Sequence, residues 1–482
     1  MRLGQTSIVY FISKILGSAL GFFATVYIVR ILGEEIYGYY SLTLAVVLWV
    51  AIGGKIGITS AVTKRVSEGT ERDAFVTAGF LMSATMFGVI TIAVLLFREQ
   101  INSYVGAPVA EFVILLVFVD LLRGFTNAAL KGHHLVHIYA PLSTAKIGIR
   151  SLAQIILVFV GFSLGGILMG YAVGGMLVGI VGLWILKFRP SLPRKRHFAS
   201  LFDYAKFSWL GNMRGRVFNS IDIIVLGAFV SAGLVGVYAV AWSIAKFLDI
   251  FGNAISTTLF PEMSNASAKN DPSAISHLVE DALAFAGLFL IPGVIGGAIV
   301  ADRLLLIYGE GVVRGAAVLV ILIFALLIYA YSKQLLNTLN AIDRPDLAFR
   351  ANAIFITSNV ILNIFLIWQF GWIGAAIATA ISAAIGLVSS FYYAHRLVPF
   401  GTPTNEFAYQ WLSALIMGTI VYTTRQVIET HWEWISDYNA VFVVVLVGLG
   451  GTIYFIIYFL ISSTFRTIVS RNLPFKIPFV QR

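Results

Sequence analysis

The sequence contains no cysteine, few charged residues and no polar stretch long enough to form a soluble domain. The absence of cysteine excludes disulfide bonds, thiolate metal sites and a cysteine nucleophile. Charged residues make up 12% of the 482 residues, whereas roughly 25% is typical of soluble domains. Apolar runs of about 20 residues, the length that a helix needs to cross a bilayer, recur from end to end. The composition therefore excludes a soluble enzyme and predicts an all-α, polytopic membrane protein.

The apolar runs predict about fourteen transmembrane helices, from residues 7–30 at the start of the chain to residues 440–462 near its end. Most Lys and Arg residues outside these spans fall in alternate loops, together with both termini. Cytoplasmic loops are enriched in Lys and Arg. The pattern therefore predicts a multi-pass protein of the cell (plasma) membrane with both termini in the cytoplasm.

The two halves of the chain resemble each other, as expected of transporters built from parallel repeats. The segment Glu35 to Leu42, which opens the second predicted helix, aligns with Gly233 to Val240, which opens the eighth. A basic segment interrupted by Pro190 and Pro193 separates the halves and cannot be helical throughout. We therefore predict four parts: an N-terminal lobe of six helices (1–187), a basic cytoplasmic linker (188–205), a C-terminal lobe of six helices (206–396), and two further helices with a cytoplasmic tail (397–482).

Basic residues within the predicted spans greatly outnumber acidic ones. The bases are Lys14, Lys55, Arg123, Lys146, Arg150, Arg214, Arg216, Lys246 and Lys333. The acids are Asp120, Asp222 and Asp249. A charge at the bilayer centre costs about 2.5 to 3.5 kcal/mol, so these bases should face a hydrated internal cavity rather than lipid.

An excess of cations in such a cavity predicts an anionic substrate. Phosphate fits best, because Arg offers its oxygens a planar fork of donors and Lys offers a point charge. We therefore predict that the nine bases bind substrate. The three acids are candidates for coupling transport to Na⁺ or H⁺, since a carboxylate in a membrane helix can exchange either ion.

Position within the helices separates these bases into two groups. Lys55 and Lys333 lie about one turn from the cytoplasmic ends of their spans and could reach the surface instead. The deeper bases, which have fewer acids near them and are the ones expected to line the cavity, are Lys14, Arg150, Arg214 and Arg216.

Spacing offers a structural alternative for some of the charges. Asp120 and Arg123 are three residues apart, as are Lys246 and Asp249, so each pair could neutralise itself on one helix face. Lys146 and Arg150, four residues apart, share a face with no acid between them.

Other patterns have simpler explanations. The glycines at 166, 170 and 174 are spaced for close helix packing. His133 and His137 have the spacing of a metal pair but no convincing third ligand, and no G-x-x-x-x-G-K-[ST] motif is present. The enrichment of Lys and Arg in cytoplasmic loops and the attraction of these residues to anionic lipid are enough to explain the basic linker. We therefore expect no metal, no cofactor and no nucleic-acid partner.

Two segments carry a resemblance to a known family. The first runs from Ser18 to Gly33 and on to Tyr37–Leu42, and the second is Gly227–Tyr238 followed by Leu259–Glu262. With the six-plus-six-plus-two helices, they resemble the polysaccharide flippases, which export O-antigen and lipid-linked oligosaccharides. The same superfamily holds the multidrug and toxic-compound extrusion transporters. The likeness covers essentially the whole chain.

The resemblance implies a protein that is not an enzyme. It implies transfer of a saccharide linked to polyprenyl phosphate or pyrophosphate from the cytoplasmic to the outer leaflet by alternating access. The resemblance leaves open whether the carrier is undecaprenyl or dolichyl, and whether the glycan serves a surface polysaccharide or a glycoprotein. No short motif carries individual site residues over from the family.

Two other functions remain open. A drug or cation antiporter of the same superfamily would need an acid-rich cavity, which the excess of bases argues against. A membrane glycosyltransferase or ligase would need catalytic groups on an outer loop. The segment Glu429–Asp437 is the best candidate for such a loop, but its aromatic residues are typical of the membrane interface. We therefore predict no catalytic residues.

Overall fold

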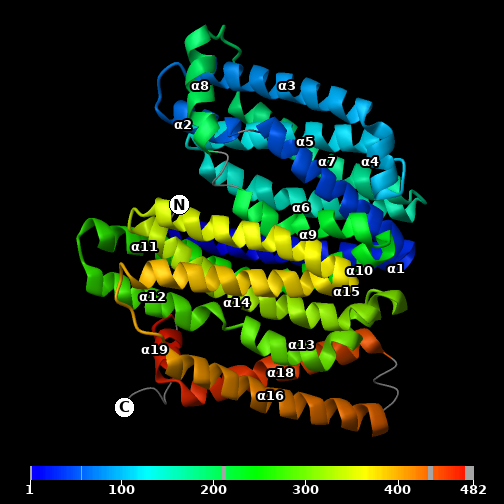
Figure 1. Ribbon diagram of the computed structural model, residues 1–482, viewed down its shortest axis with the longest axis vertical. Coiled ribbons are helices and arrows are strands. Elements are labelled where there is room, and N and C mark those ends of the chain that lie inside the picture. The colour runs from blue at the N-terminus through cyan, green and yellow to red at the C-terminus, as the bar shows by residue number, and fades with distance from the viewer. Residues whose placement is uncertain (1–2, 56, 188, 209–212, 432–437, 473–482) are drawn as a thin grey trace. The chain divides into compact units, whose positions relative to one another are not determined.

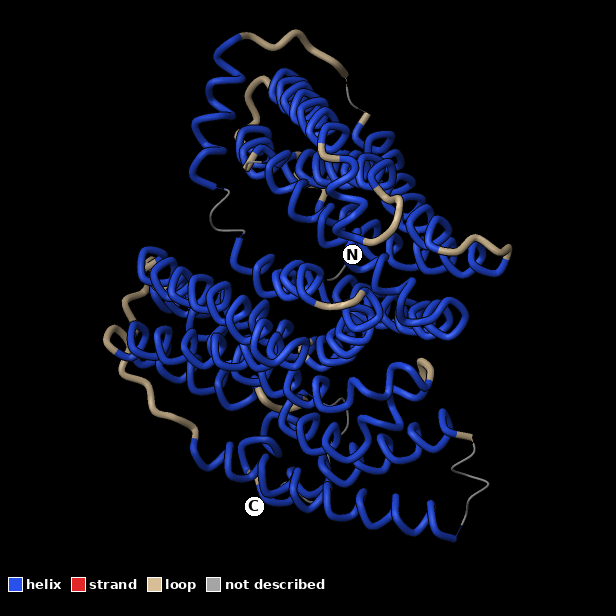
Figure 2. Tube along the Cα trace, turned by 45° about the vertical axis from the view of Figure 1, so that its right-hand side comes forward, coloured by secondary structure: helices blue, strands red, loops and turns tan. Residues whose placement is uncertain are grey.

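The computed structural model describes residues 3–55, 57–187, 189–208, 213–431 and 438–472. Throughout these residues the regular elements are helices, as Figure 2 shows. They form two compact units, residues 1–236 and residues 237–482. The prediction of an all-α fold is confirmed.

The helices of the first unit come from the N-terminal half of the chain (Figure 1). They are α1 (Leu3–Lys55), α2 (Ile58–Ser67), α3 (Arg72–Leu96), α4 (Arg98–Val105), α5 (Ala110–Gly132), α6 (Val136–Phe159), α7 (Leu164–Leu186), α8 (Lys195–Ser208) and α9 (Met213–Phe229). Helix α10 (Ala232–Leu248) begins in this unit and ends in the second.

The second unit continues with the remaining helices. They are α11 (Ile250–Ala268), α12 (Pro272–Ala286), α13 (Leu290–Leu306), the 3₁₀ helix η2 (Glu310–Gly315), α14 (Ala316–Ala341), α15 (Pro345–His395), α16 (Thr404–His431), α18 (Asn439–Ile461) and α19 (Ser463–Asn472).

Nine of the described helical segments are long and apolar enough to cross a membrane. Two of the long helices each contain two predicted spans, because α1 turns at Gly33 and α15 turns at Gly371. Both glycines have positive φ, 82° and 59°, a conformation that costs glycine little because it has no Cβ. The predicted polytopic architecture is therefore confirmed.

Two predicted spans are interrupted where continuous helices were expected. Asp249 separates α10 from α11 within the span 235–259, and residues 287–289 separate α12 from α13 within the span 278–300. At the second break Leu288 N donates to Phe285 O, so Ala284 O loses its helical partner. It accepts instead from Gln410 Nε2 of α16, at 2.7 Å.

The predicted basic linker becomes helical at Lys195, beyond both of its prolines. Helix α8 buries Leu201 and Ala205 in a core shared with Val76 and Ala78 of α3. Figure 1 shows α8 running across α3 rather than along it. The functional lobe boundaries at this linker remain a prediction, since the two compact units divide further along the chain, after Gly236.

Helices α6 and α7 pack closely through two of the glycines singled out in the sequence. A Cβ added at Gly170 would lie 2.6 Å from the Gln154 side chain, and one added at Gly174 would lie 2.7 Å from Arg150 Cβ. Such approaches leave no room for a side chain. The prediction of close packing is confirmed at these two positions.

Candidate functional site

Charged side chains from three helices of the first unit, and a tyrosine from a fourth, lie together within the membrane-spanning region. We call this group the cation cluster. Its members come from α1, α5, α6 and α7, and are Lys55, Asp120, Arg123, Lys146, Arg150 and Tyr171.

Asp120 binds two of the four bases, one with each carboxylate oxygen. Its Oδ2 lies 2.6 Å from Lys55 Nζ, and its Oδ1 lies 2.6 Å from Arg123 Nη2. The Asp120 side chain is 5% exposed, and that of Lys55 is 14% exposed. The predicted pairing of Asp120 with Arg123 is confirmed. The alternative that Lys55 reaches the surface is wrong, because its ammonium group turns inward to Asp120.

Lys146 and Arg150 contact an aromatic ring instead of a carboxylate. Lys146 Nζ lies 4.9 Å and Arg150 Cζ lies 5.7 Å from the centroid of the Tyr171 ring, distances typical of cation–π contacts. Within the described part of the chain, neither base forms an ion pair with a carboxylate, and Arg150 Nε is buried without a hydrogen-bond partner. The Tyr171 ring therefore contacts two bases that no described carboxylate neutralises.

The glycine packing of α6 against α7 explains why both bases reach the same ring. Tyr171 lies between Gly170 and Gly174, two positions where the backbone of α6 approaches too closely to leave room for a Cβ. Lys146 and Arg150 are four residues apart and share a face of α6. Close packing brings that face onto the tyrosine.

The end of α1 and the start of α2 lie beside the cluster. Lys55 is the last residue of α1, and Gly57 caps the start of α2 with a φ of 71°. Lys55 therefore joins the end of α1 to the middle of α5 through Asp120.

Neutral polar groups adjoin the cluster one helical turn beyond Arg150. Gln154 Nε2 donates to the Tyr40 hydroxyl at 3.1 Å and to Ile167 O at 2.8 Å. The rings of Tyr37 and Tyr40 are 5.7 Å apart. The sequence analysis missed Tyr171, Tyr40 and Gln154. Tyr171 had a visible signal, since it stands between two glycines with packing spacing.

The remaining predicted residues lie elsewhere or cannot be placed. Asp222 is buried on α9, Lys246 lies 5.2 Å above the ring of Trp242, Asp249 precedes α11, and Lys333 is on α14. Side chains that fall outside the described residues are those of Lys14, Arg214 and Arg216. The convergence of bases from both halves on one cavity therefore remains a prediction.

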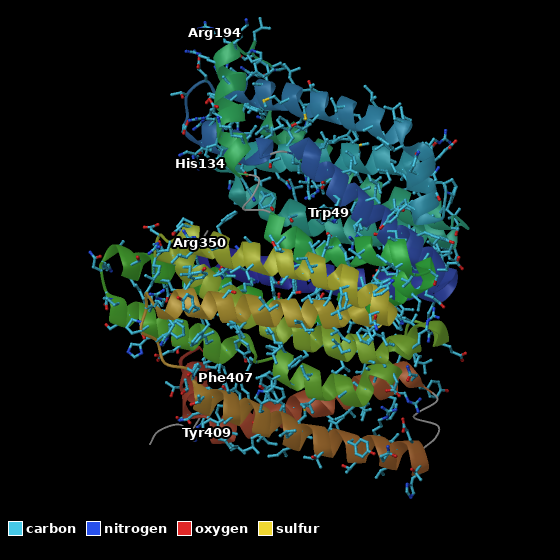
Figure 3. The ribbon with its side chains drawn as sticks, viewed as in Figure 1. Trp49, His134, Arg194, Arg350, Phe407 and Tyr409 are labelled. Atoms are coloured by element: carbon cyan, nitrogen blue, oxygen red, sulfur yellow. The ribbon has the colours of Figure 1, made fainter. Side chains whose placement is uncertain are left out.

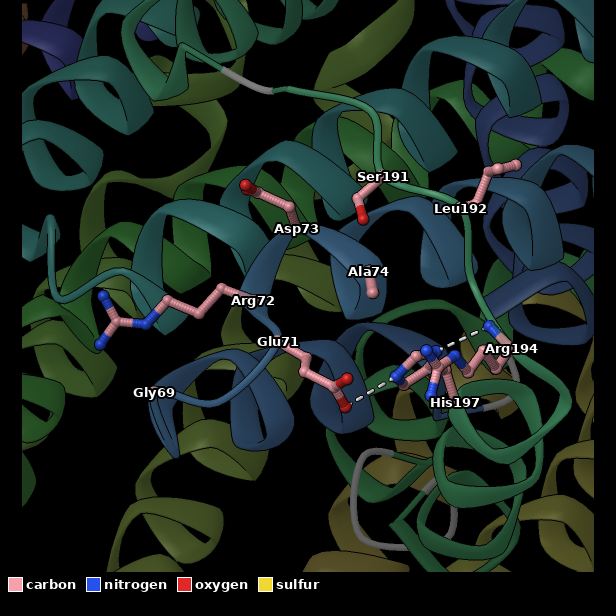
Figure 4. A pocket seen from close by; sticks show the side chains of 9 residues that line it. All are labelled: Gly69, Glu71, Arg72, Asp73, Ala74, Ser191, Leu192, Arg194 and His197. Carbon is pink, nitrogen blue, oxygen red and sulfur yellow. Dashed lines mark hydrogen bonds and ion pairs between the residues drawn. The ribbon is translucent and has the colours of Figure 1, made fainter.

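A second group of charges holds the start of α8, which follows the exposed Arg194 (Figure 3), to the turn between α2 and α3. Glu71 accepts from Arg196 Nη2 at 2.5 Å. It also accepts from His197 Nε2 at 3.0 Å, and His197 Nδ1 accepts from Arg194 N at 2.9 Å (Figure 4). The hydrogen bond from His197, with the charge of Arg196, lowers the pKa of the Glu71 carboxyl.

Glu71, Arg194 and His197 are among the residues that line an open pocket with a volume of about 360 Å³. Two of the lining side chains, Glu71 and His197, bond to each other, and Glu71 also pairs with Arg196 of α8. We therefore interpret it as a structural junction rather than a substrate site.

Comparisons with known proteins agree with this fold. The family described as "Polysaccharide biosynthesis protein" matches residues 27–311. "Probable flippase AglR" of Haloferax volcanii is 31% identical over 98% of both chains. "Probable low-salt glycan biosynthesis flippase Agl15" of the same organism is 26% identical over 89% of this chain and 92% of its own.

Solved structures share the architecture at low sequence identity. The Lipid II flippase MurJ, in an inward closed conformation, superposes with a TM-score of 0.80 at 18% identity, over 96% of this chain and 100% of that one. A multidrug resistance MATE family transporter gives a TM-score of 0.66 at 15% identity, over 79% of this chain and 94% of that one.

Proposed function

Because the chain belongs to the polysaccharide biosynthesis protein family, we propose that it is a flippase for a lipid-linked saccharide. It moves a sugar carried on polyprenyl or dolichyl phosphate, or pyrophosphate, from the cytoplasmic to the outer leaflet of the cell membrane. Both termini are cytoplasmic in this proposal. The protein transports its substrate without chemical change.

The observation that carries this proposal is the pair Lys146 and Arg150. Both are held by the Tyr171 ring, and neither is neutralised by a described carboxylate. Uncompensated cations inside a membrane protein are costly, so they favour a site that an anion fills. A phosphate suits them, because Arg donates through a planar fork and Lys donates as a point charge.

Transport follows from binding at such a site. The bases replace the hydration that the phosphate loses on leaving the membrane surface, and the prenyl chain stays in lipid. Asp222 and Asp249, with Asp120, are candidates for coupling to Na⁺ or H⁺, since each lies within a predicted membrane span. Alternating access then exposes the headgroup to the outer leaflet.

The shared MATE fold raises export of cationic drugs as a second function. The cation cluster opposes it, because four bases surround one carboxylate. A cationic ligand would meet repulsion there rather than attraction.

Translocation in proteoliposomes tests the proposal. The probe is a fluorescent sugar on a short polyprenyl phosphate, whose exposure on each leaflet is read by quenching. Lys146→Gln and Arg150→Gln should each slow translocation by about tenfold or more, because each removes a charged donor to the phosphate. Arg150→Lys should restore part of the rate, since it keeps the charge and loses the fork.

The matched control is Arg98→Gln. Arg98 pairs with Glu111 at 2.8 Å, and both side chains are 56% exposed, so this change removes a base outside the cluster. Wild-type rates in both cluster variants, with the control also unaffected, would contradict the proposal.

A further inference from the structure

Asp120 occupies a position that the proposed function leaves unexplained. A site meant for phosphate holds a carboxylate of the chain itself, bound to two of its four bases. Both nitrogen–oxygen distances are 2.6 Å, which indicates tight, charge-assisted hydrogen bonds. The cluster therefore contains an anion before any ligand enters.

A carboxylate and a phosphate offer the same pattern to these bases. Each presents two oxygens that a guanidinium and an ammonium can bind at once. Asp120 uses one oxygen for Lys55 and the other for Arg123. A phosphate that takes these two donors must therefore displace the carboxylate.

We propose that Asp120 is the resident counter-anion of the site, which holds Lys55 and Arg123 when the site is empty and yields them to the phosphate of the headgroup. This inference rests on the proposed function and deepens it. Lys146 and Arg150 capture the phosphate first, because no carboxylate among the described residues pairs with them. Lys55 and Arg123 join afterwards, by exchange.

The exchange explains how an empty flippase returns. Bases left without a counter-ion would resist being enclosed in the protein after the substrate leaves. With Asp120 back in place, two of the four bases are paired again and one unit of their positive charge is compensated. Because Asp120 competes with the phosphate for Lys55 and Arg123, it weakens phosphate binding. This favours release of the lipid-linked saccharide at the outer leaflet.

The exchange also ties binding to a change of shape. Lys55 ends α1 beside the left-handed Gly57, and its bond to Asp120 fastens that helix end to α5. A phosphate that binds Lys55 in place of Asp120 breaks the ion pair between the end of α1 and α5, next to the start of α2. Substrate and conformation are thereby linked through one ion pair.

A merely structural ion pair makes the opposite prediction for binding. Removing one partner of a buried pair leaves a charge without compensation and destabilises the fold. In that case loss of Asp120 weakens every function of the protein. If Asp120 competes with the substrate, its loss tightens binding.

Calorimetry on the purified full-length protein in detergent separates these outcomes, with farnesyl phosphate as the probe. Asp120→Asn should bind the probe about tenfold more tightly than wild type, because charged donors become available to the ligand. Multiple-turnover translocation in proteoliposomes should slow, since the empty site lacks its counter-ion. The control Glu111→Gln, in the exposed pair with Arg98, should change neither. Unchanged or weaker binding by Asp120→Asn overturns the inference.

A second set of variants keeps the test decisive if Asp120→Asn folds poorly. Lys55→Gln alone should weaken binding of farnesyl phosphate, because Asp120 then pairs with Arg123 alone and neutralises its charge. Lys55→Gln with Asp120→Asn keeps the net charge of wild type and should recover wild-type affinity or better, because Arg123 is free for the phosphate. A double variant that binds no better than Lys55→Gln overturns the inference.

Failure of the proposed function gives a different result. In that case the wild type either does not bind farnesyl phosphate or binds it equally well after Arg150→Gln. The role proposed for Asp120 then fails together with the proposed function. Binding that depends on Arg150 but does not improve without Asp120 overturns only the role of Asp120.

Discussion

At the scale of single residues, Tyr171 holds the two bases that no described carboxylate neutralises. Its ring lies within 6 Å of both, so the negative face of one aromatic system is shared by two cations. An acid at this position would neutralise the bases and remove the reason for a phosphate to bind. An aromatic ring orients them and leaves their charge available.

Replacing this ring should therefore weaken phosphate binding without removing any charge. Tyr171→Leu should raise the farnesyl phosphate Kd by about tenfold, since a desolvated cation–π contact contributes up to about 2 kcal/mol. Tyr171→Phe keeps the ring and should bind nearly as wild type does. Calorimetry in detergent measures both. Equal losses in the two variants would show that the hydroxyl, not the ring, matters.

The sequence predicts only part of this cluster. The spacing of Asp120 and Arg123 indicates their pairing, and the spacing of Lys146 and Arg150 places both on one helix face. The bond between Lys55 and Asp120 joins residues 65 positions apart, so no local pattern reveals it. The role of Tyr171 depends on the packing of α6 against α7. Local spacing could not provide that information.

At the scale of helices, the break between α12 and α13 depends on a side chain from α16. Ala284 O has lost its partner within the helix and accepts from Gln410 Nε2, and Gln410 is fully buried. The same amide donates to the Tyr458 hydroxyl, which donates to Glu406. Hydropathy predicts one continuous span here, because it does not show where a carbonyl will find another donor.

Removing this donor should destabilise the second unit. Gln410→Leu leaves Ala284 O buried and without its partner, at a cost of about 1 to 3 kcal/mol. Thermal unfolding in detergent should show a lower midpoint than wild type. Gln426→Leu, an exposed position on the same helix, is the matched control and should have little effect. Equal midpoints for the two variants would contradict this account of the break.

The ion pairs between Glu71 and the start of α8 should make the attachment of α8 depend on pH. The Glu71 pKa is lowered from its ordinary value of 4.5 by the hydrogen bond from His197 and by Arg196. The ionised Glu71 carboxylate therefore contributes fully to holding α8 when the pH is above 4.5. This contribution is lost as the pH falls from there through the lowered pKa of Glu71. Hydrogen exchange of the α8 amides, corrected for intrinsic rates, measures this loss.

The comparison with Glu71→Gln isolates the carboxylate. At neutral pH the α8 amides of the variant should exchange faster than those of wild type. The difference should disappear once acid has protonated Glu71. A difference that persists unchanged at low pH would show that ionisation of Glu71 does not fasten α8.

At the scale of the whole molecule, the fold and the family are the features best predicted from the sequence. Apolar runs, the basic linker and the alternation of Lys and Arg between loops can be interpreted from the physics of a bilayer alone. The resemblance to polysaccharide flippases is confirmed by the family match and by a relative that spans nearly the whole chain. The same fold carries lipid II flippases and multidrug transporters. Charge inside the fold, rather than the fold itself, therefore argues for the substrate.

The measurement that tests the central claim most directly compares two lipids that differ only at the phosphate. One carries a fluorescent sugar on polyprenyl phosphate, and the other carries the same sugar on the same prenyl chain through a neutral ether. In proteoliposomes, wild-type protein should translocate the phosphate lipid and leave the ether lipid near the protein-free rate. Arg150→Gln should slow translocation of the phosphate lipid alone. Equal translocation of both lipids by wild type would contradict recognition of the phosphate by the cation cluster.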